Sequence, residues 1–90
     1  MENQHRKITG YRELNAEEIA LMNEVKELGP QIEAVILKVQ AHVKKQREDY
    51  DENYQRLEDA TPERFSALAK TDFQTGLMYL VRAVAQPTTF

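Results

Sequence analysis

The sequence predicts an all-α protein, because apolar residues recur at helical spacing and no segment alternates as a half-buried strand does. The 90 residues are enough for one domain, expected to span residues 1–90. Towards the C-terminus, apolar side chains repeat at i, i+3 and i+4. In the middle of the chain they form a heptad stripe that comprises Ile32, Ile36, Val39, Val43, Tyr50 and Leu57.

Residues 1–14 are expected to form an arm, followed by a short first helix at residues 16–28. Asn15 is a favourable N-cap, and Glu18 three positions later completes the pattern of a capping box. Gly29-Pro30 is predicted to end this helix, because proline has no N–H for an interior helical hydrogen bond.

A second, long helix is predicted at residues 31–58, carrying the heptad stripe. Its seam becomes polar at Gln46 and Asn53, within the charge-rich stretch KKQREDYDENYQR. We expect this stretch to be a solvated helix face with looser packing or a kink. A tight turn is predicted at Asp59-Ala60.

The third helix is predicted at residues 62–85 and is expected to lie antiparallel to the second. Thr61 is the predicted cap, and Pro62 takes the first helical position, where a missing N–H costs nothing. Pro87 lies just beyond the predicted end of the helix.

The last helix also predicts an oligomer. Between residues 77 and 84 its apolar side chains lie on every side, and a helix that is apolar all round is buried all round. One long helix and one short helix cannot cover it. We therefore expect further copies of the chain to supply the missing contacts.

Composition limits the partners and the compartment. The net charge of −3 and the sequence pI of about 5.4 argue against duplex DNA or RNA as a partner. The chain has no Cys, so disulfides and thiol chemistry are excluded. The N-terminus lacks the apolar region of a secretory signal, and the most apolar stretch, residues 76–85, is too short to span a bilayer. We expect a soluble, intracellular protein.

The sequence predicts no enzyme, no metal site and no cofactor. It contains neither a zinc-protease HExxH pattern nor a phosphate-binding GxxxxGK[ST] loop. His5 and His42, the two histidines, lie far apart in sequence. The acidic clusters are typical of solvated helix faces.

The segment that carries candidate chemistry is ITGYRELNAEEIALMNEVK, at residues 8–26. Tyr11 stands on the arm, and Lys26 stands near the end of the helix that follows. An aromatic ring can stack on a nucleobase, and an ammonium can pair with a phosphate. The alternatives are a Tyr11 that seals the arm onto the helices and a solvated Lys26.

Two stretches, ITGYRELNAEEIALMNEVKELG and TPERFSALAKTDFQTGLMYLVRAVAQPT, resemble the small phage-encoded anti-CBASS sponge family. The resemblance runs over nearly the whole chain. It implies an all-helical, interlocked hexamer built from dimers, which captures cyclic di- and trinucleotide messengers in the cytoplasm of the infected bacterium and keeps them from the host's effectors.

The resemblance also implies roles for individual residues. The family's Tyr in ITGYR stacks on a base and the Lys of the next helix pairs with a phosphate, and both match here, at Tyr11 and Lys26. Arg12 is a secondary candidate for a phosphate contact. Arg64 fits by position a second site for cyclic trinucleotides, although Leu28 stands where that site is expected to have a polar residue.

Helix geometry bears on how Tyr11 and Lys26 could meet. Lys26 lies about 15 Å along the axis from the predicted helix start, which the connection from Tyr11 to Asn15 spans only if nearly extended. The alternative is a meeting of residues from different subunits. A cyclic dinucleotide is nearly two-fold symmetric, so a C2 interface could offer each residue once to each half of the ligand.

Two other classes of function remain open from the sequence. One is a helical interaction module, such as a phage inhibitor of a host protein. The other is a cyclic-nucleotide hydrolase, which the missing catalytic set disfavours. Mixing the protein with a cyclic dinucleotide and then denaturing it by heat distinguishes the three classes. A sponge releases intact ligand and a hydrolase releases cleaved ligand, whereas an interaction module does not take the ligand out of solution.

Overall fold

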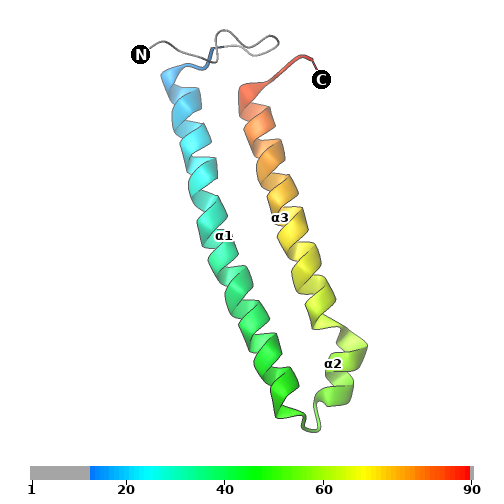
Figure 1. Cartoon of the computed structure of the whole chain (residues 1–90). Coiled ribbons are helices and arrows are strands. Elements are labelled where there is room, and N and C mark those ends of the chain that lie inside the picture. The colour runs from blue at the N-terminus through cyan, green and yellow to red at the C-terminus, as the bar shows by residue number, and fades with distance from the viewer. Residues whose placement is uncertain (1–12, 90) are drawn as a thin grey trace.

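A computed structural model describes residues 13–89, which form an antiparallel helical hairpin (Figure 1). Helix α1 spans Ala16–Asp49, α2 spans Tyr54–Ala60 and α3 spans Pro62–Ala85. α1 packs along α3, and the start of α1 and the end of α3 lie together at the open end of the hairpin. The hairpin is elongated, with extents of 61 × 25 × 18 Å. The predicted all-α class is confirmed, since the described range contains helices and no strand.

The start of α1 agrees with the prediction. The Asn15 side chain accepts a hydrogen bond from the Glu18 backbone N–H at 2.9 Å, and the Glu18 carboxylate accepts one from the Asn15 N–H at 2.9 Å. This reciprocal capping box satisfies two N–H groups that a helix start otherwise leaves unpaired.

The predicted break at Gly29-Pro30 is wrong, because α1 runs unbroken from Ala16 to Asp49. Half-buried and buried positions keep helical spacing straight through the dipeptide, at residues 22, 25, 29, 32, 36, 40 and 43. All of them belong to one face, and splitting the helix would remove half of that face from α3. An interior proline costs roughly 3 kcal/mol. Packing of the continuous face outweighs that cost.

Gly29 reduces the local conflict. The residue before a proline is disfavoured in a helix partly because its Cβ meets the proline ring, and glycine has no Cβ. Pro30 is exposed and lines the cavity that it shares with Phe73 and Leu77 of α3, so its ring is not buried in the contact between the helices.

The predicted helix at 31–58 and the tight turn at Asp59-Ala60 are also wrong. α1 ends at Asp49, and the chain reverses over residues 50–53, whereas Asp59-Ala60 lies inside α2. Tyr50 adopts a left-handed conformation with φ 39°, and the Asp51 carboxylate accepts the Asn53 N–H at 2.9 Å. Asp and Asn favour turns through such local hydrogen bonds, and the polar seam residue Asn53 is part of this turn.

α2 and α3 meet at a corner made by Thr61 and Pro62. A residue before proline is disfavoured in the right-handed helical region, and Thr61 takes φ 47°. Its N–H still bonds the Leu57 carbonyl at 3.0 Å. The side chain of Thr61 makes no capping hydrogen bond, contrary to the prediction, but Pro62 begins α3 and Ala85 ends it as predicted.

Burial inside the hairpin is small. Of the described apolar residues, Val43 and Leu57 are buried, near the turn. No helix among residues 13–89 combines the length and apolar character that crossing a bilayer requires.

Candidate functional site

A cleft of about 420 Å³ lies between α1 and α3 on the open-end side of Gly29. We call it the Lys26 cleft. It is lined by Val25, Lys26 and Gly29 from α1, by Leu77, Met78, Val81, Arg82 and Ala85 from α3, and by Pro87. Its walls are therefore mostly apolar, with one cation from each helix.

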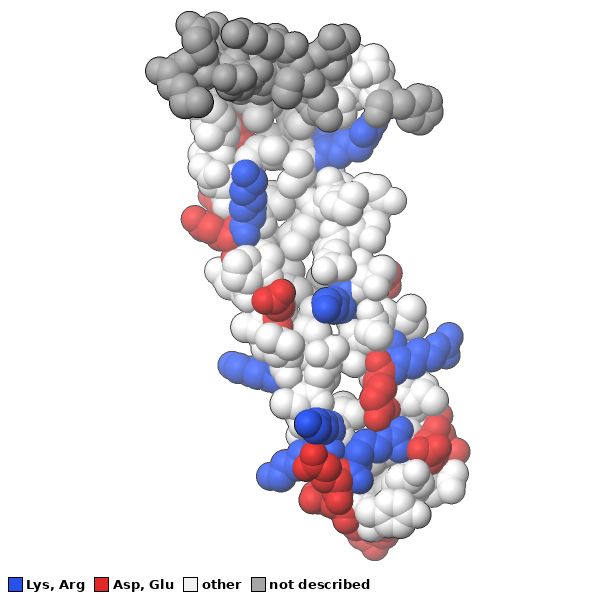
Figure 2. All heavy atoms as spheres, viewed as in Figure 1, with Lys and Arg blue, Asp and Glu red and all other residues white. Residues whose placement is uncertain are grey.

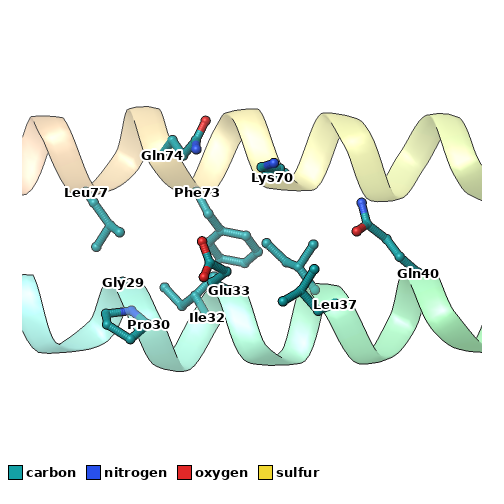
Figure 3. Close-up of a pocket in the computed structure, with 11 residues that line it drawn as sticks. Gly29, Pro30, Ile32, Glu33, Leu37, Gln40, Lys70, Phe73, Gln74 and Leu77 are labelled. Atoms are coloured by element: carbon teal, nitrogen blue, oxygen red, sulfur yellow. The ribbon is translucent and has the colours of Figure 1, made fainter.

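The charge of its lining distinguishes this cleft from three other cavities along residues 13–89. A neighbouring cavity of about 350 Å³ combines Lys70 with Glu33, and Figure 3 shows Phe73 directed from α3 into it. A third cavity combines cations with Glu63, and a fourth has acidic residues and no cation. Of these four, the Lys26 cleft alone is lined by cations without a carboxylate.

The distribution of charged side chains over the hairpin also separates the region of the Lys26 cleft from the turn end. In Figure 2, blue and red side chains crowd together at the turn end of the hairpin, whereas the half towards the open end is largely white with a few separate charges. Neither Lys26 nor Arg82 forms an ion pair or side-chain hydrogen bond with another described residue. Both charges are therefore available to an external anion.

The structure describes some of the predicted site residues and not others. Lys26 is exposed on α1 and lines the cleft. Tyr11 and Arg12 lie outside the described residues, so their predicted roles stay predictions. Arg82 was not among the predicted candidates: the sequence shows it as a charge in an apolar stretch, and only the continuous, antiparallel α1 places it in the lining of the same cleft as Lys26.

Arg64 stands apart from this cleft. It lies in the first turn of α3, near the hairpin turn, with its guanidinium 5.6 Å from the centre of the Phe65 ring. Leu28 lines a different cavity, together with Leu80 of α3. Sixteen helical residues separate positions 64 and 80, about 24 Å. A site that used both Arg64 and Leu28 would therefore need more than one chain.

No metal centre is apparent in the described part of the chain. Among residues 13–89, no three His, Asp or Glu side chains are grouped closely enough to hold an ion. His42 is exposed on α1, and His5 lies outside the described residues.

The fold and the cleft define a small all-helical hairpin protein with a positively lined, mainly apolar groove. A model of the family described as "Acb2/Tad1, hairpin domain" matches residues 3–85, and the chain belongs to this family. The chain is also similar to Anti-CBASS protein 2 of Pseudomonas phage JBD67, with 40% identity over 105 aligned positions that cover 97% of each chain. These comparisons confirm the predicted family.

Proposed function

We propose that this protein counters CBASS immunity in phage-infected bacteria by binding cyclic oligonucleotide messengers and holding them away from the host's effectors. Family membership and the similarity to Anti-CBASS protein 2 support this role. The observation that carries the proposal is Lys26 in a cleft with cationic and apolar lining and no carboxylate.

The lining suits the chemistry of such a ligand. A cyclic dinucleotide presents phosphodiester anions beside nucleobases and riboses. Lys26 supplies a compact charge for a phosphate, and the apolar walls can cover the faces of the sugar or base. Tyr11 is the proposed stacking partner, with Arg12 as a secondary phosphate contact. In this proposal the protein acts by binding alone and needs no metal or cofactor.

The binding form is proposed to be a homo-oligomer, in line with the hexamer that the family resemblance implies. Two copies related by a two-fold axis would present two equivalent clefts to a ligand with two phosphates. A separate trinucleotide site near Arg64 would likewise draw on several chains. The place of action is proposed to be the cytoplasm of the infected bacterium.

The proposal is tested by isothermal titration with a purine cyclic dinucleotide. Tyr11→Ala should weaken binding by about 30-fold to more than 10⁴-fold, because a symmetric site loses two stacking contacts of about 1–3 kcal/mol each. Lys26→Ala should also weaken binding severely and flatten its salt dependence. Lys38→Ala, which removes an exposed cation of α1 outside the cleft, is the matched control and should bind normally.

Two further measurements separate the mechanisms. Tyr11→Phe should retain most binding if stacking dominates, and a loss equal to that of Tyr11→Ala would show that the hydroxyl makes the contact. Heating the loaded protein should release intact cyclic dinucleotide, whereas cleaved ligand would mark a hydrolase. Absence of any binding heat from the unmodified protein would leave the helical interaction module as the better explanation.

A further inference from the structure

We infer that Arg82 is a second phosphate-binding residue, which acts together with Lys26 as a two-cation clamp formed within one chain. The inference rests on the proposed function, since it assigns an anionic ligand to the Lys26 cleft. Lys26 reaches this cleft from α1 and Arg82 from α3, so the two charges stand on opposite walls. Both residues are exposed, and neither is neutralised by a described carboxylate.

The backbone around the cleft gives a bound anion no favourable helix start. Helix starts attract anions, but the effect fades within the first turn. Lys26 lies about 15 Å beyond the start of α1 at Ala16, so that helix start gives no help. The cleft also borders Ala85, the last residue of α3, where the helix end carries partial negative charge. That end opposes a phosphate, and the charge of Arg82 offsets it.

The residues around Arg82 in the sequence support a role for its guanidinium in phosphate binding. Arg82 is the one charged residue between Phe73 and Thr89. Its neighbours on the cleft wall, Met78 and Val81, are apolar. A guanidinium placed there can offer two parallel N–H groups to phosphate oxygens, whereas an ammonium acts as a point charge. The clamp would therefore hold a phosphodiester in a defined orientation between Lys26 and Arg82.

A simpler role for Arg82 must be separated from this one. A cation in the last turn of a helix stabilises the helix end, as Arg82 does for α3. Any cation serves that role, so Arg82→Lys should preserve it. Bidentate phosphate contact depends on the guanidinium and should be impaired by the same substitution.

The experiment compares the full chain with Arg82→Gln, Arg82→Lys and Arg56→Gln, titrating each with a purine cyclic dinucleotide at several salt concentrations. Arg56 is an exposed arginine of α2 near the hairpin turn, and its replacement is the matched control. Arg82→Gln should bind at least about tenfold more weakly, with a shallower salt dependence. Arg82→Lys should keep the salt dependence of the unmodified protein and still bind measurably more weakly, and Arg56→Gln should match the unmodified protein.

The outcomes distinguish this inference from the proposed function. If Lys26→Ala weakens binding but Arg82→Gln and Arg82→Lys bind normally, the clamp is wrong and the proposed function stands. If Arg82→Lys binds normally and Arg82→Gln only lowers the melting temperature, Arg82 serves the helix end and the clamp is likewise wrong. If the unmodified protein binds no cyclic dinucleotide, the proposed function fails, and the inference fails with it. Arg82→Lys keeps the charge and so still tests the clamp if Arg82→Gln does not fold.

Discussion

Arg47 shows how single residues close the turn of the hairpin. Its guanidinium donates to the Glu63 carboxylate at 2.7 Å, to the Glu58 carboxylate at 2.6 Å and to the Leu57 carbonyl at 3.2 Å. One side chain of α1 thereby holds the end of α2 and the start of α3. The hydrogen bond from Arg47 lowers the pKa of Glu63 below its usual range, and hydrogen bonding to Glu63 likewise raises the pKa of Arg47.

Arg47→Ala is expected to lower the melting temperature by a few degrees and to weaken its acid dependence. The folded pKa of Glu63 lies below its unfolded value, so the pair stabilises the fold above the unfolded pKa. That stability is lost as the pH falls from the ordinary glutamate range through the lowered pKa. Thermal unfolding between about pH 3 and pH 7 measures the effect.

Lys44→Ala is the control for this prediction, because Lys44 is exposed on the same helix and makes no ion pair with another residue among residues 13–89. Its melting curve should follow the unmodified protein at each pH. An acid dependence that survives unchanged in Arg47→Ala would show that the pair contributes nothing measurable.

Contacts between residues across the hairpin could not be predicted from the sequence. Arg47 lies in the charge run that was expected to be solvated, yet its side chain is 23% exposed. Its partners follow 11 and 16 positions later, beyond a turn whose place differs from the predicted one. Lys26 was predicted as a candidate from its segment, but its place in one cleft with Arg82 follows only from the register of α1 against α3. Pairings across a hairpin cannot be derived until the turn is known.

At the scale of elements, local signals identified two helix starts correctly, although the predicted side-chain cap of Thr61 does not form. The capping box at Asn15 and the bounds of α3 were predicted correctly. The break at Gly29-Pro30 was not, because a continuous packed face outweighed a local helix breaker. The hairpin turn shows the opposite outcome: the heptad stripe favoured a continuous helix, but the local turn residues Asp51 and Asn53 follow the end of α1 at Asp49.

Pro30→Ala is expected to stabilise α1. It restores an N–H that can bond the carbonyl of Lys26 and removes the clash of the proline ring with that carbonyl. Pro30 is exposed, so the change opens no buried cavity. The gain should be about 1–3 kcal/mol by urea unfolding, compared at equal protein concentration because assembly would add to the stability.

Asn23→Ala is a suitable comparison, since it changes an exposed position of the same helix with only a propensity gain of at most about 0.7 kcal/mol. A loss of stability in Pro30→Ala would contradict the argument and indicate that the proline shapes α1 for a contact with another chain. Titration of the same variant with a cyclic dinucleotide would then show whether the shape of α1 at Lys26 also matters for binding.

At the scale of the whole molecule, one hairpin leaves much apolar surface uncovered. Met78 and Tyr79 are each 68% exposed and Leu80 is 47% exposed, all within one turn of α3. On α1, Leu21 and Leu28 line the same cavity as Leu80. The sequence predicted that one chain cannot bury all the apolar side chains of α3, and the exposure of these residues agrees with that prediction.

This exposure predicts that the chain exists in solution as an obligate oligomer. Removing apolar area from water is favourable by about 25 cal/mol per Å² before the entropic cost of association is subtracted, and the exposed face of α3 is the surface that further copies can cover. Sedimentation equilibrium at micromolar concentration should give a mass that is a multiple of the 10.5 kDa chain.

Leu80→Asp should dissociate or unfold the protein, because a carboxylate would be left in a desolvated contact. Asn23→Asp adds the same charge at an exposed polar position of α1 and should assemble normally. A stable folded monomer of the unmodified chain would contradict the prediction, and with it the shared two-chain site.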